Sequence, residues 1–133
     1  MMKGMVFGTI LAVAFLTLVG CATTEQGLRA RGLAPLTQSE LEALYARTRI
    51  IRGSSPDGLG LLGTYTQEGG ARLDWGRGAA AGSWRIAEGK FCTKYQGIHN
   101  GEERCVTIYK TGENEYKTFF PDGTCNGTTS LFL

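Results

Sequence analysis

The segment "GSWRIAEGKFCTKY", residues 82–95, decides the fold. Apolar and polar side chains alternate on both sides of Glu88-Gly89, a dipeptide that suits a two-residue hairpin turn. This turn sets Ile86 opposite Phe91. Because successive side chains of a strand point to opposite faces, the segment predicts an antiparallel hairpin with one apolar face.

Glycine-rich turns separate further segments of this kind from residue 47 onward. The chain contains 20 glycines and only 3 prolines, a composition typical of short strands joined by tight turns. We expect strands near residues 48–52, 60–67, 71–76, 83–87, 90–96, 103–110, 115–121 and 125–132. Most connections are short enough to require antiparallel neighbours. The predicted fold class is all-β, a small antiparallel meander forming an open or closed barrel of about eight strands.

One short helix precedes the strands, in "LTQSELEALYAR" at residues 36–47. Thr37 is followed three residues later by Glu40, which is the pattern of a capping box. Leu41, Leu44 and Tyr45 lie at helical spacing and form one apolar face. The helix should therefore pack against the β-structure.

The first 22 residues differ from the rest of the chain. Lys3 is their only charge, and the apolar run that follows ends at Leu18-Val19-Gly20-Cys21. These four residues resemble the bacterial lipobox, in which the cysteine is acylated and becomes the first residue of the mature protein. An uncleaved membrane helix is the alternative. We expect a lipoprotein signal peptide at 1–20, a lipidated tether at 21–35 and a single β-rich domain at 36–133.

Acylation of Cys21 predicts where the protein resides. Two or more lipid chains hold a protein on a membrane without a spanning segment. Ala22 after the cysteine favours the outer membrane. The expected location is therefore the cell envelope, on the periplasmic face of the outer membrane, where disulfides are permitted.

The loop "QGIHNGEE" leaves two registers open for the strands on either side of it. A turn at Asn100-Gly101 would set Cys92 opposite Tyr109. A wider loop sets Cys92 opposite Cys105, and this register is preferred because it joins the apolar residues into one face. The predicted face contains Trp84, Ile86, Phe91, Tyr95, Val106, Ile108 and Phe119. The preferred register predicts a Cys92–Cys105 disulfide and leaves Cys125 as an odd thiol.

Two more turns set the remaining faces. Residues 69–70 as a two-residue turn place Leu62 in the core and Tyr65 on the outside. The loop "TGEN", taken as a four-residue connection, sets Val106 opposite Phe119. In this register Tyr109, Tyr116 and Phe120 share the outer face with the disulfide.

Charge and spacing exclude several classes of function. The net charge is only +2, and no basic cluster suggests a nucleic-acid partner. The cysteines and His99 lack the close pairs of a zinc site, so we expect no metal and no cofactor. His99 is the single histidine and lies in a predicted loop, and no G-x-S-x-G motif accompanies it. The sequence therefore favours a protein that is not an enzyme.

Two binding hypotheses follow. Tyr109, Tyr116 and Phe120 would form an exposed recognition patch for an envelope protein, unless the helix covers them. Alternatively, the protein is an inhibitor-like barrel, or it carries a small apolar ligand between Trp75, Trp84 and Phe91.

Short motifs along the chain resemble a known family. "LTQSELEAL", "GTY", "GSWRI", "FCTKY", "RCVTIY" and "FFPDG" occur in this order between Leu36 and Gly127. Their order resembles that of small bacterial envelope proteins of domain-of-unknown-function family 995. The resemblance implies an envelope lipoprotein. It supplies no catalytic residues, because the family has no assigned activity.

Overall fold

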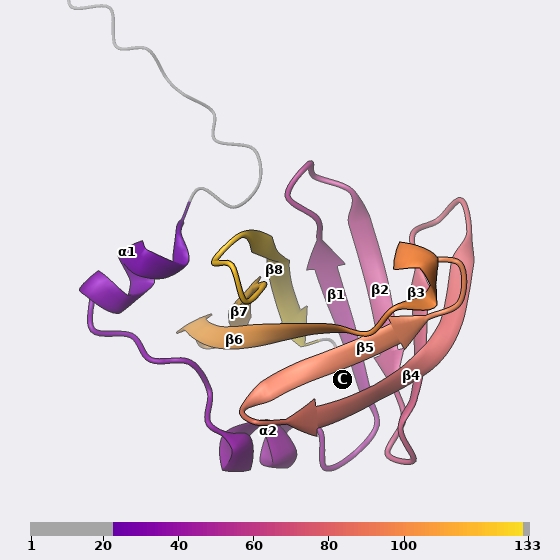
Figure 1. Cartoon of the computed structure of the whole chain (residues 1–133), viewed down its shortest axis with the longest axis horizontal. Helices are drawn as coiled ribbons and strands as arrows, with labels where there is room; N and C mark the ends of the chain where they lie inside the picture. The colour runs from indigo at the N-terminus through magenta and orange to yellow at the C-terminus, as the bar shows by residue number, and fades with distance from the viewer. Residues whose placement is uncertain (1–22, 132–133) are drawn as a thin grey trace, which may run out of the picture.

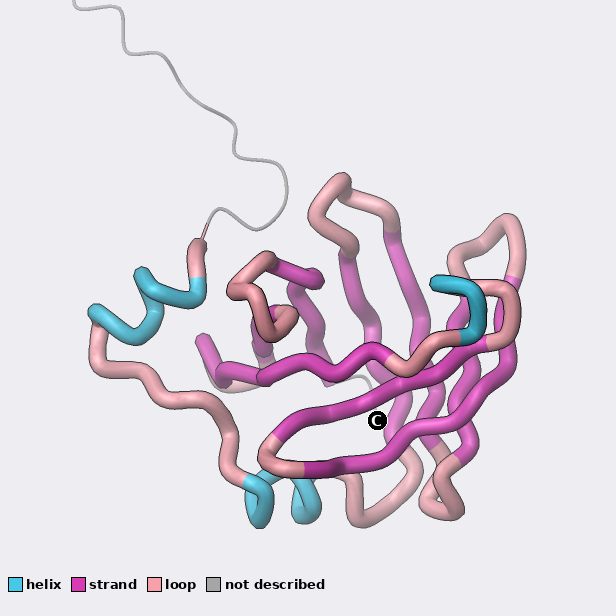
Figure 2. The backbone as a smooth tube through the Cα atoms, in the orientation of Figure 1, coloured by secondary structure: helices cyan, strands magenta, loops and turns pink. Residues whose placement is uncertain are grey.

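The chain closes into an eight-stranded antiparallel barrel in a computed structural model that describes residues 23–131. Each strand pairs with the next along the chain, and β1 pairs with β8 (Figures 1 and 2). The elements are α1 (Glu25–Ala30), α2 (Gln38–Leu44), β1 (Arg49–Ser54), β2 (Gly60–Tyr65), β3 (Gly70–Asp74), β4 (Ala79–Ala87), β5 (Lys90–Tyr95), the 3-10 turn η1 (His99–Gly101), β6 (Arg104–Gly112), β7 (Glu115–Phe119) and β8 (Cys125–Leu131). The predicted all-β meander with a short helix is confirmed.

The expected signal peptide at 1–20 and the expected lipidation site Cys21 lie outside the described residues. Within residues 23–131, no helix combines the length and the apolar character needed to cross a membrane.

The β4–β5 hairpin has the predicted register. Ile86 lies opposite Phe91, and Arg85 lies opposite Cys92. Glu88 and Gly89 form the turn, with φ of 54° and 72°. A two-residue turn with positive φ at both positions matches the twist of the strands that it joins.

Helix α2 closes one end of the barrel. Its capping box is formed, because Glu40 N–H donates to the Thr37 hydroxyl and Thr37 N–H donates to the Glu40 carboxylate. Leu41 is 0% exposed, and it belongs to the core cluster inside the barrel. Gly89 N–H donates to the side chain of Gln38, which ties the helix to the β4–β5 turn. The predicted helix is thus confirmed.

Helix α1 lies in the segment that was expected to be an unstructured tether. The Thr24 hydroxyl accepts from Gly27 N–H and caps it. Leu28 is 0% exposed and packs with Tyr109 and Phe119 on the outer surface of the barrel. A six-residue helix is not stable alone, so its burial against the barrel is what stabilises it.

The β2–β3 register differs from the prediction. Tyr65 lies opposite Ala71, since Gly70 belongs to β3 and the turn is formed by the residues before it. The prediction was wrong by three positions, and an odd shift reverses the faces of a strand. Tyr65 is consequently buried inside the barrel, whereas Leu62 is 40% exposed.

The β6–β7 register also differs, by one position. Phe119 lies opposite Thr107 rather than Val106, because Thr111 is an extra residue between the paired positions at the end of β6. The slip reverses the faces of β7. Tyr116 is therefore in the barrel core and Phe119 is on the outer surface, which corrects both assignments.

Candidate binding cavity

A cavity of about 430 Å³ occupies the barrel interior. Its wall includes the buried side chains of Ile51, Phe91, Val106 and Ile108, which come from β1, β5 and β6. Tyr45, at the end of α2, lines it as well. Because inward-facing residues alternate with outward-facing ones along each strand, these apolar side chains converge on one space.

Exposed residues line the cavity at the other end of the barrel. Pro56 follows β1, His99 belongs to η1, and Asn126 lies in β8. In Figure 1, η1 and the β1–β2 connection lie away from α2. The cavity is therefore closed by α2 at one end and reaches the surface at the other.

Aromatic rings form the floor of the cavity above α2. The Tyr45 ring stacks on Phe91, with 4.3 Å between centroids. Tyr65 meets Phe91 edge to face at 5.1 Å. Trp84, which does not line the cavity, supports the floor by packing beside Phe91 at 5.8 Å. Offset-stacked and edge-to-face rings attract one another, so this floor is rigid as well as apolar.

Two tyrosine hydroxyls meet inside the barrel. The hydroxyl oxygens of Tyr65 and Tyr95 are 3.1 Å apart, within hydrogen-bond distance. Burial raises the pKa of both side chains, since ionisation would place a charge in an apolar surrounding. Both groups are therefore neutral at physiological pH.

The strand registers explain how these two tyrosines meet. Tyr65, Ala71, Gly82 and Tyr95 form one row across β2 to β5, with the two small residues between the rings. Gly63 provides further room, because a Cβ there would lie 2.6 Å from the Tyr65 hydroxyl oxygen. The sequence prediction missed this pair, since it placed Tyr65 outside. The alternation of Leu61, Gly63 and Tyr65 was the available signal.

Charged side chains are confined to the mouth of the cavity. His99, Glu102 and Arg104 line it there and are exposed. No hydrogen bond joins His99 to a nucleophilic side chain within residues 23–131.

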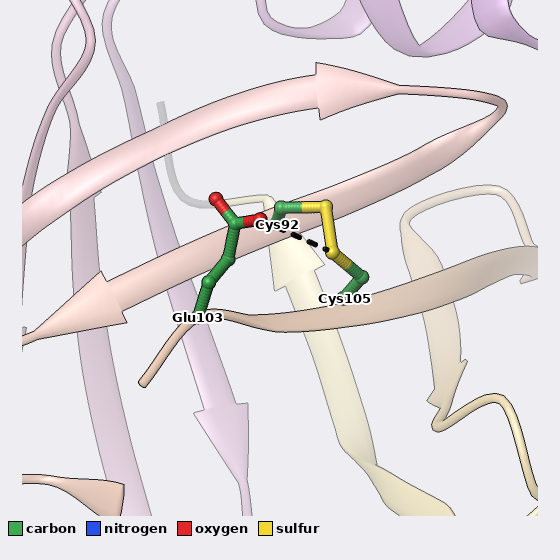
Figure 3. A group of neighbouring side chains, drawn as sticks. All are labelled: Cys92, Glu103 and Cys105. Carbon is green, nitrogen blue, oxygen red and sulfur yellow. Dashed lines mark hydrogen bonds between the residues drawn. A yellow bond between two sulfur atoms is a disulfide. The ribbon is translucent and has the colours of Figure 1, made fainter. Parts of the chain in front are cut away.

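The predicted Cys92–Cys105 disulfide is confirmed. The two residues lie opposite each other on β5 and β6, with 4.0 Å between their Cα atoms. Figure 3 shows the Glu103 carboxylate beside this bridge. The carboxylate oxygen lies 3.9 Å from the Cys105 sulfur, which carries no proton in a disulfide. Arg85 donates to both oxygens of Glu103, at 2.6 and 2.7 Å.

This group contains three residue types that bind metals, but its chemistry does not suit a metal ion. Cys92, Glu103 and Cys105 have potential ligand atoms within 4.8 Å of one another. Both sulfurs are consumed by the disulfide, and cysteine binds a metal ion such as zinc as the thiolate. Arg85 lowers the pKa of Glu103 through its hydrogen bonds. The carboxylate is thus already paired with a cation.

The aromatic residues expected to form an exposed patch do not do so. Tyr109 is on the outer surface but is 0% exposed, because α1 covers it. Its hydroxyl donates to Glu25 at 3.1 Å. Tyr116 lies in the barrel core, and Phe120 packs against that core and lines the cavity. The cover is α1, and not α2 as the alternative had it.

The other expected site residues are distributed differently. Phe91 lines the cavity, whereas Trp75 and Trp84 do not line it and pack against the core. Cys125 lies opposite Phe119, where the prediction had Phe120, because Asn126 is an extra residue in β8. The expectation of an odd thiol at Cys125 is wrong, since no cysteine in the described part of the chain is free.

A comparison with protein-family models, with curated proteins and with solved structures finds no match to the chain. The resemblance to family 995 stays a prediction.

Proposed function

We propose that this protein is a lipid-anchored envelope lipoprotein, without catalytic activity, that binds a small apolar molecule inside its barrel. The observation that carries the ligand-binding part is the cavity of about 430 Å³ with buried aromatic and aliphatic walls. Ligand pockets typically have volumes of about 300–1,000 Å³ and mostly apolar linings with a few polar groups. An eight-stranded barrel is also wide enough to hold one small ligand.

The anchoring part of the proposal comes from the sequence. Cys21 follows a lipobox-like run, and α1 begins at Glu25, only a few residues later. If Cys21 carries the acyl chains, the folded barrel is held close to the bilayer surface. A binding protein in that position has direct access to apolar molecules of the membrane.

A surface that binds an envelope protein has less support than the cavity. That hypothesis depended on Tyr109, Tyr116 and Phe120 being exposed together. Two of the three are buried, and they lie on opposite faces of the barrel wall. The described residues provide no comparable aromatic patch on the outside.

A fluorescence titration tests ligand binding. The probe is N-phenyl-1-naphthylamine, a neutral apolar dye that brightens when it leaves water. We expect saturable binding by the wild-type protein. In a Val106→Phe variant the added ring occupies cavity space, and the dye should bind at least about tenfold more weakly, the equivalent of about 1.4 kcal/mol.

The matched control is Leu62→Phe. This substitution adds a ring to a side chain on the outer surface, which is 40% exposed. It should leave dye binding unchanged. Equal affinities for wild type and Val106→Phe, or a loss of binding in Leu62→Phe alone, would place the dye outside the barrel and contradict the proposal.

Metabolic labelling tests the anchor. Labelled palmitate should enter the wild-type chain and be absent from a Cys21→Ser variant. The sulfur of Cys21 cannot be in a thioether and in a disulfide at the same time. A non-reducing peptide map that joins Cys21 to Cys125 would therefore contradict acylation at the sulfur of that residue.

A further inference from the structure

Three tyrosine side chains belong to the wall of the cavity. Tyr45, Tyr65 and Tyr95 all line it, and each is buried. The Tyr45 and Tyr65 rings are 5.9 Å apart, and the hydroxyls of Tyr65 and Tyr95 are in contact. These two contacts connect the three side chains into one cluster of tyrosines in the cavity wall.

This cluster has hydrogen-bond donors that the protein does not use. Each tyrosine has one O–H group to donate. In the Tyr65–Tyr95 pair one hydroxyl donates to the other, so the accepting hydroxyl still has its own proton available. A ligand atom that accepts this proton would satisfy a group that is 9% exposed at most.

Tyr45 provides the second donor. Its side chain is 5% exposed, and its hydroxyl makes no hydrogen bond within residues 23–131. Every fully buried side-chain nitrogen or oxygen in that part of the chain has a partner, so the Tyr45 oxygen must border open space. The cavity is the open space that Tyr45 lines. An unpartnered hydroxyl at a buried position is a marker of a missing hydrogen-bond acceptor.

The surroundings of the cluster select against a charged acceptor. No charged residue is among the buried residues of the described chain, and Thr118 is the only polar one besides the tyrosines. Burial raises the pKa of all three tyrosines, so they remain neutral donors. Arg104 and the other charged lining residues are exposed at the mouth. The cation that acts on Tyr45 is Arg49, which does not line the cavity and donates to the Leu44 carbonyl. An anion at the cluster would therefore lose its hydration without a direct contact to a counterion, which is costly.

We propose that the cavity takes an uncharged, largely apolar molecule whose ketone or ester carbonyl oxygen enters first and accepts hydrogen bonds from Tyr45 and the Tyr65–Tyr95 pair. This inference rests on the proposed ligand-binding function and names the ligand class for the same site. The apolar part of the molecule contacts Ile51, Val106 and Ile108. The carbonyl oxygen fits because it has two lone pairs and needs no proton of its own.

Competition against the dye N-phenyl-1-naphthylamine tests the ligand class. The competitors are 2-decanone, which has a neutral carbonyl, and decanoate at pH 8, which has the same chain length and a negative charge. The full-length protein should bind 2-decanone at least about tenfold more tightly than decanoate, because only the anion loses a charge-stabilising hydration shell.

Removal of the hydroxyls tests the cluster directly. Tyr45→Phe and Tyr95→Phe keep the rings and remove one O–H group each. Each should weaken 2-decanone binding by roughly three- to tenfold, the value of one neutral hydrogen bond, while circular dichroism shows the same fold as in the wild type. Tyr116→Phe is the matched control, since Tyr116 is a core tyrosine that does not line the cavity. It should not change either affinity.

The outcomes separate this inference from the function on which it rests. If the wild-type protein does not bind the dye, the ligand-binding function itself fails. If the dye binds but decanoate competes as well as 2-decanone, the ligand is an amphipathic anion held at the mouth and the inference is overturned. Unchanged 2-decanone affinity in both hydroxyl variants also overturns it. A circular dichroism spectrum that matches the wild type shows that those variants are folded.

Discussion

The Cys92–Cys105 disulfide should stabilise the weakest strand pairing of the barrel, which is the pairing of β5 with β6. β5 and β6 share three paired positions, Phe91–Val106, Cys92–Cys105 and Thr93–Arg104, fewer than any other neighbouring strands among the described residues. Beyond Val106 the two strands separate, and Ile108 C=O accepts from Leu36 N–H of the segment before α2 instead. Because β5 and β6 make few hydrogen bonds to each other, we expect the disulfide to provide much of the stability of this pairing.

The expected stabilisation follows from the size of the closed loop. The two cysteines are 13 residues apart. In the loop-entropy model, a crosslink over such a loop contributes about 3 kcal/mol by restricting the unfolded chain. For a domain of this size the loss corresponds to a fall in Tm of about 10 °C.

The variant Cys92→Val/Cys105→Val isolates the crosslink. Valine keeps an apolar side chain at both positions and suits a strand. Calorimetry should show the fall in Tm, and hydrogen exchange should show faster opening at the amides of β5 and β6 while those of β1 and β2 change less. An unchanged Tm would refute the loop-entropy estimate. An equal increase in exchange around the whole barrel, which a change in global unfolding alone would give, would refute the claim that the β5–β6 pairing is the weakest.

Three further predictions concern the packing of the barrel. Leu28→Ala should reduce the free energy of unfolding by about 2–4 kcal/mol, because it leaves a cavity under α1. Urea denaturation measures this loss, and a change near zero would mean that α1 does not pack on the barrel. Gly82→Ala should prevent folding, since a Cβ at that position would lie 1.8 Å from a backbone oxygen of β5. The control Gly60→Ala should fold, because no atom lies within 4 Å of a Cβ at that position, and circular dichroism of both variants distinguishes the two results. Burial raises the pKa values of Tyr65 and Tyr95 above 10.0 in the folded state, so their contribution to stability is complete below pH 10 and decreases as the pH rises above it. Ultraviolet titration should show these tyrosines ionising only as the barrel unfolds. Ionisation near pH 10 in the folded protein would contradict their burial.

Turn chemistry determined which parts of the fold were predictable. The Glu88-Gly89 turn has a single favourable geometry, so it set the β4–β5 register correctly. The disulfide followed from the β5–β6 register, which was chosen because it joins the apolar residues into one face. The turn before β3 was misassigned because Gly70 looks like a turn residue but pairs within the strand. A glycine dipeptide alone does not show whether its second member belongs to the turn or to the strand.

The β6–β7 error has a different cause. A bulge adds one residue to a strand without a marked sequence signal, and Thr111 is an ordinary strand residue. One extra residue reversed the faces of β7. The exposed patch predicted from Tyr116 was a direct consequence of that slip.

Helix α1 was not predictable from local pattern. It has six residues and includes a glycine, and its single apolar contact is Leu28. It forms because Tyr109 and Phe119, more than 80 positions away in sequence, provide the surface that Leu28 covers, and because Glu25 accepts hydrogen bonds from Thr107 and Tyr109. Only the assembled barrel brings these partners together.

The sequence predicted a ligand-carrying barrel only as the alternative to an exposed recognition patch, and it did not predict the tyrosine hydroxyls in the cavity wall. Tyr45 was assigned to the apolar face of its helix, which is where it lies. Its hydroxyl acquires a role only because the barrel leaves space above it. Whether a barrel interior is filled or hollow depends on the summed volume of all inward side chains, and a register error in two strands makes that sum unreliable.

Methyl-labelled NMR with bound 2-decanone tests the central claim most directly. Ligand binding inside the barrel predicts intermolecular NOEs from the alkyl chain to the methyl groups of Ile51, Val106 and Ile108, which line the cavity. NOEs confined to Leu62, an exposed leucine on the outer surface of β2, would show that the molecule binds outside and would contradict the account.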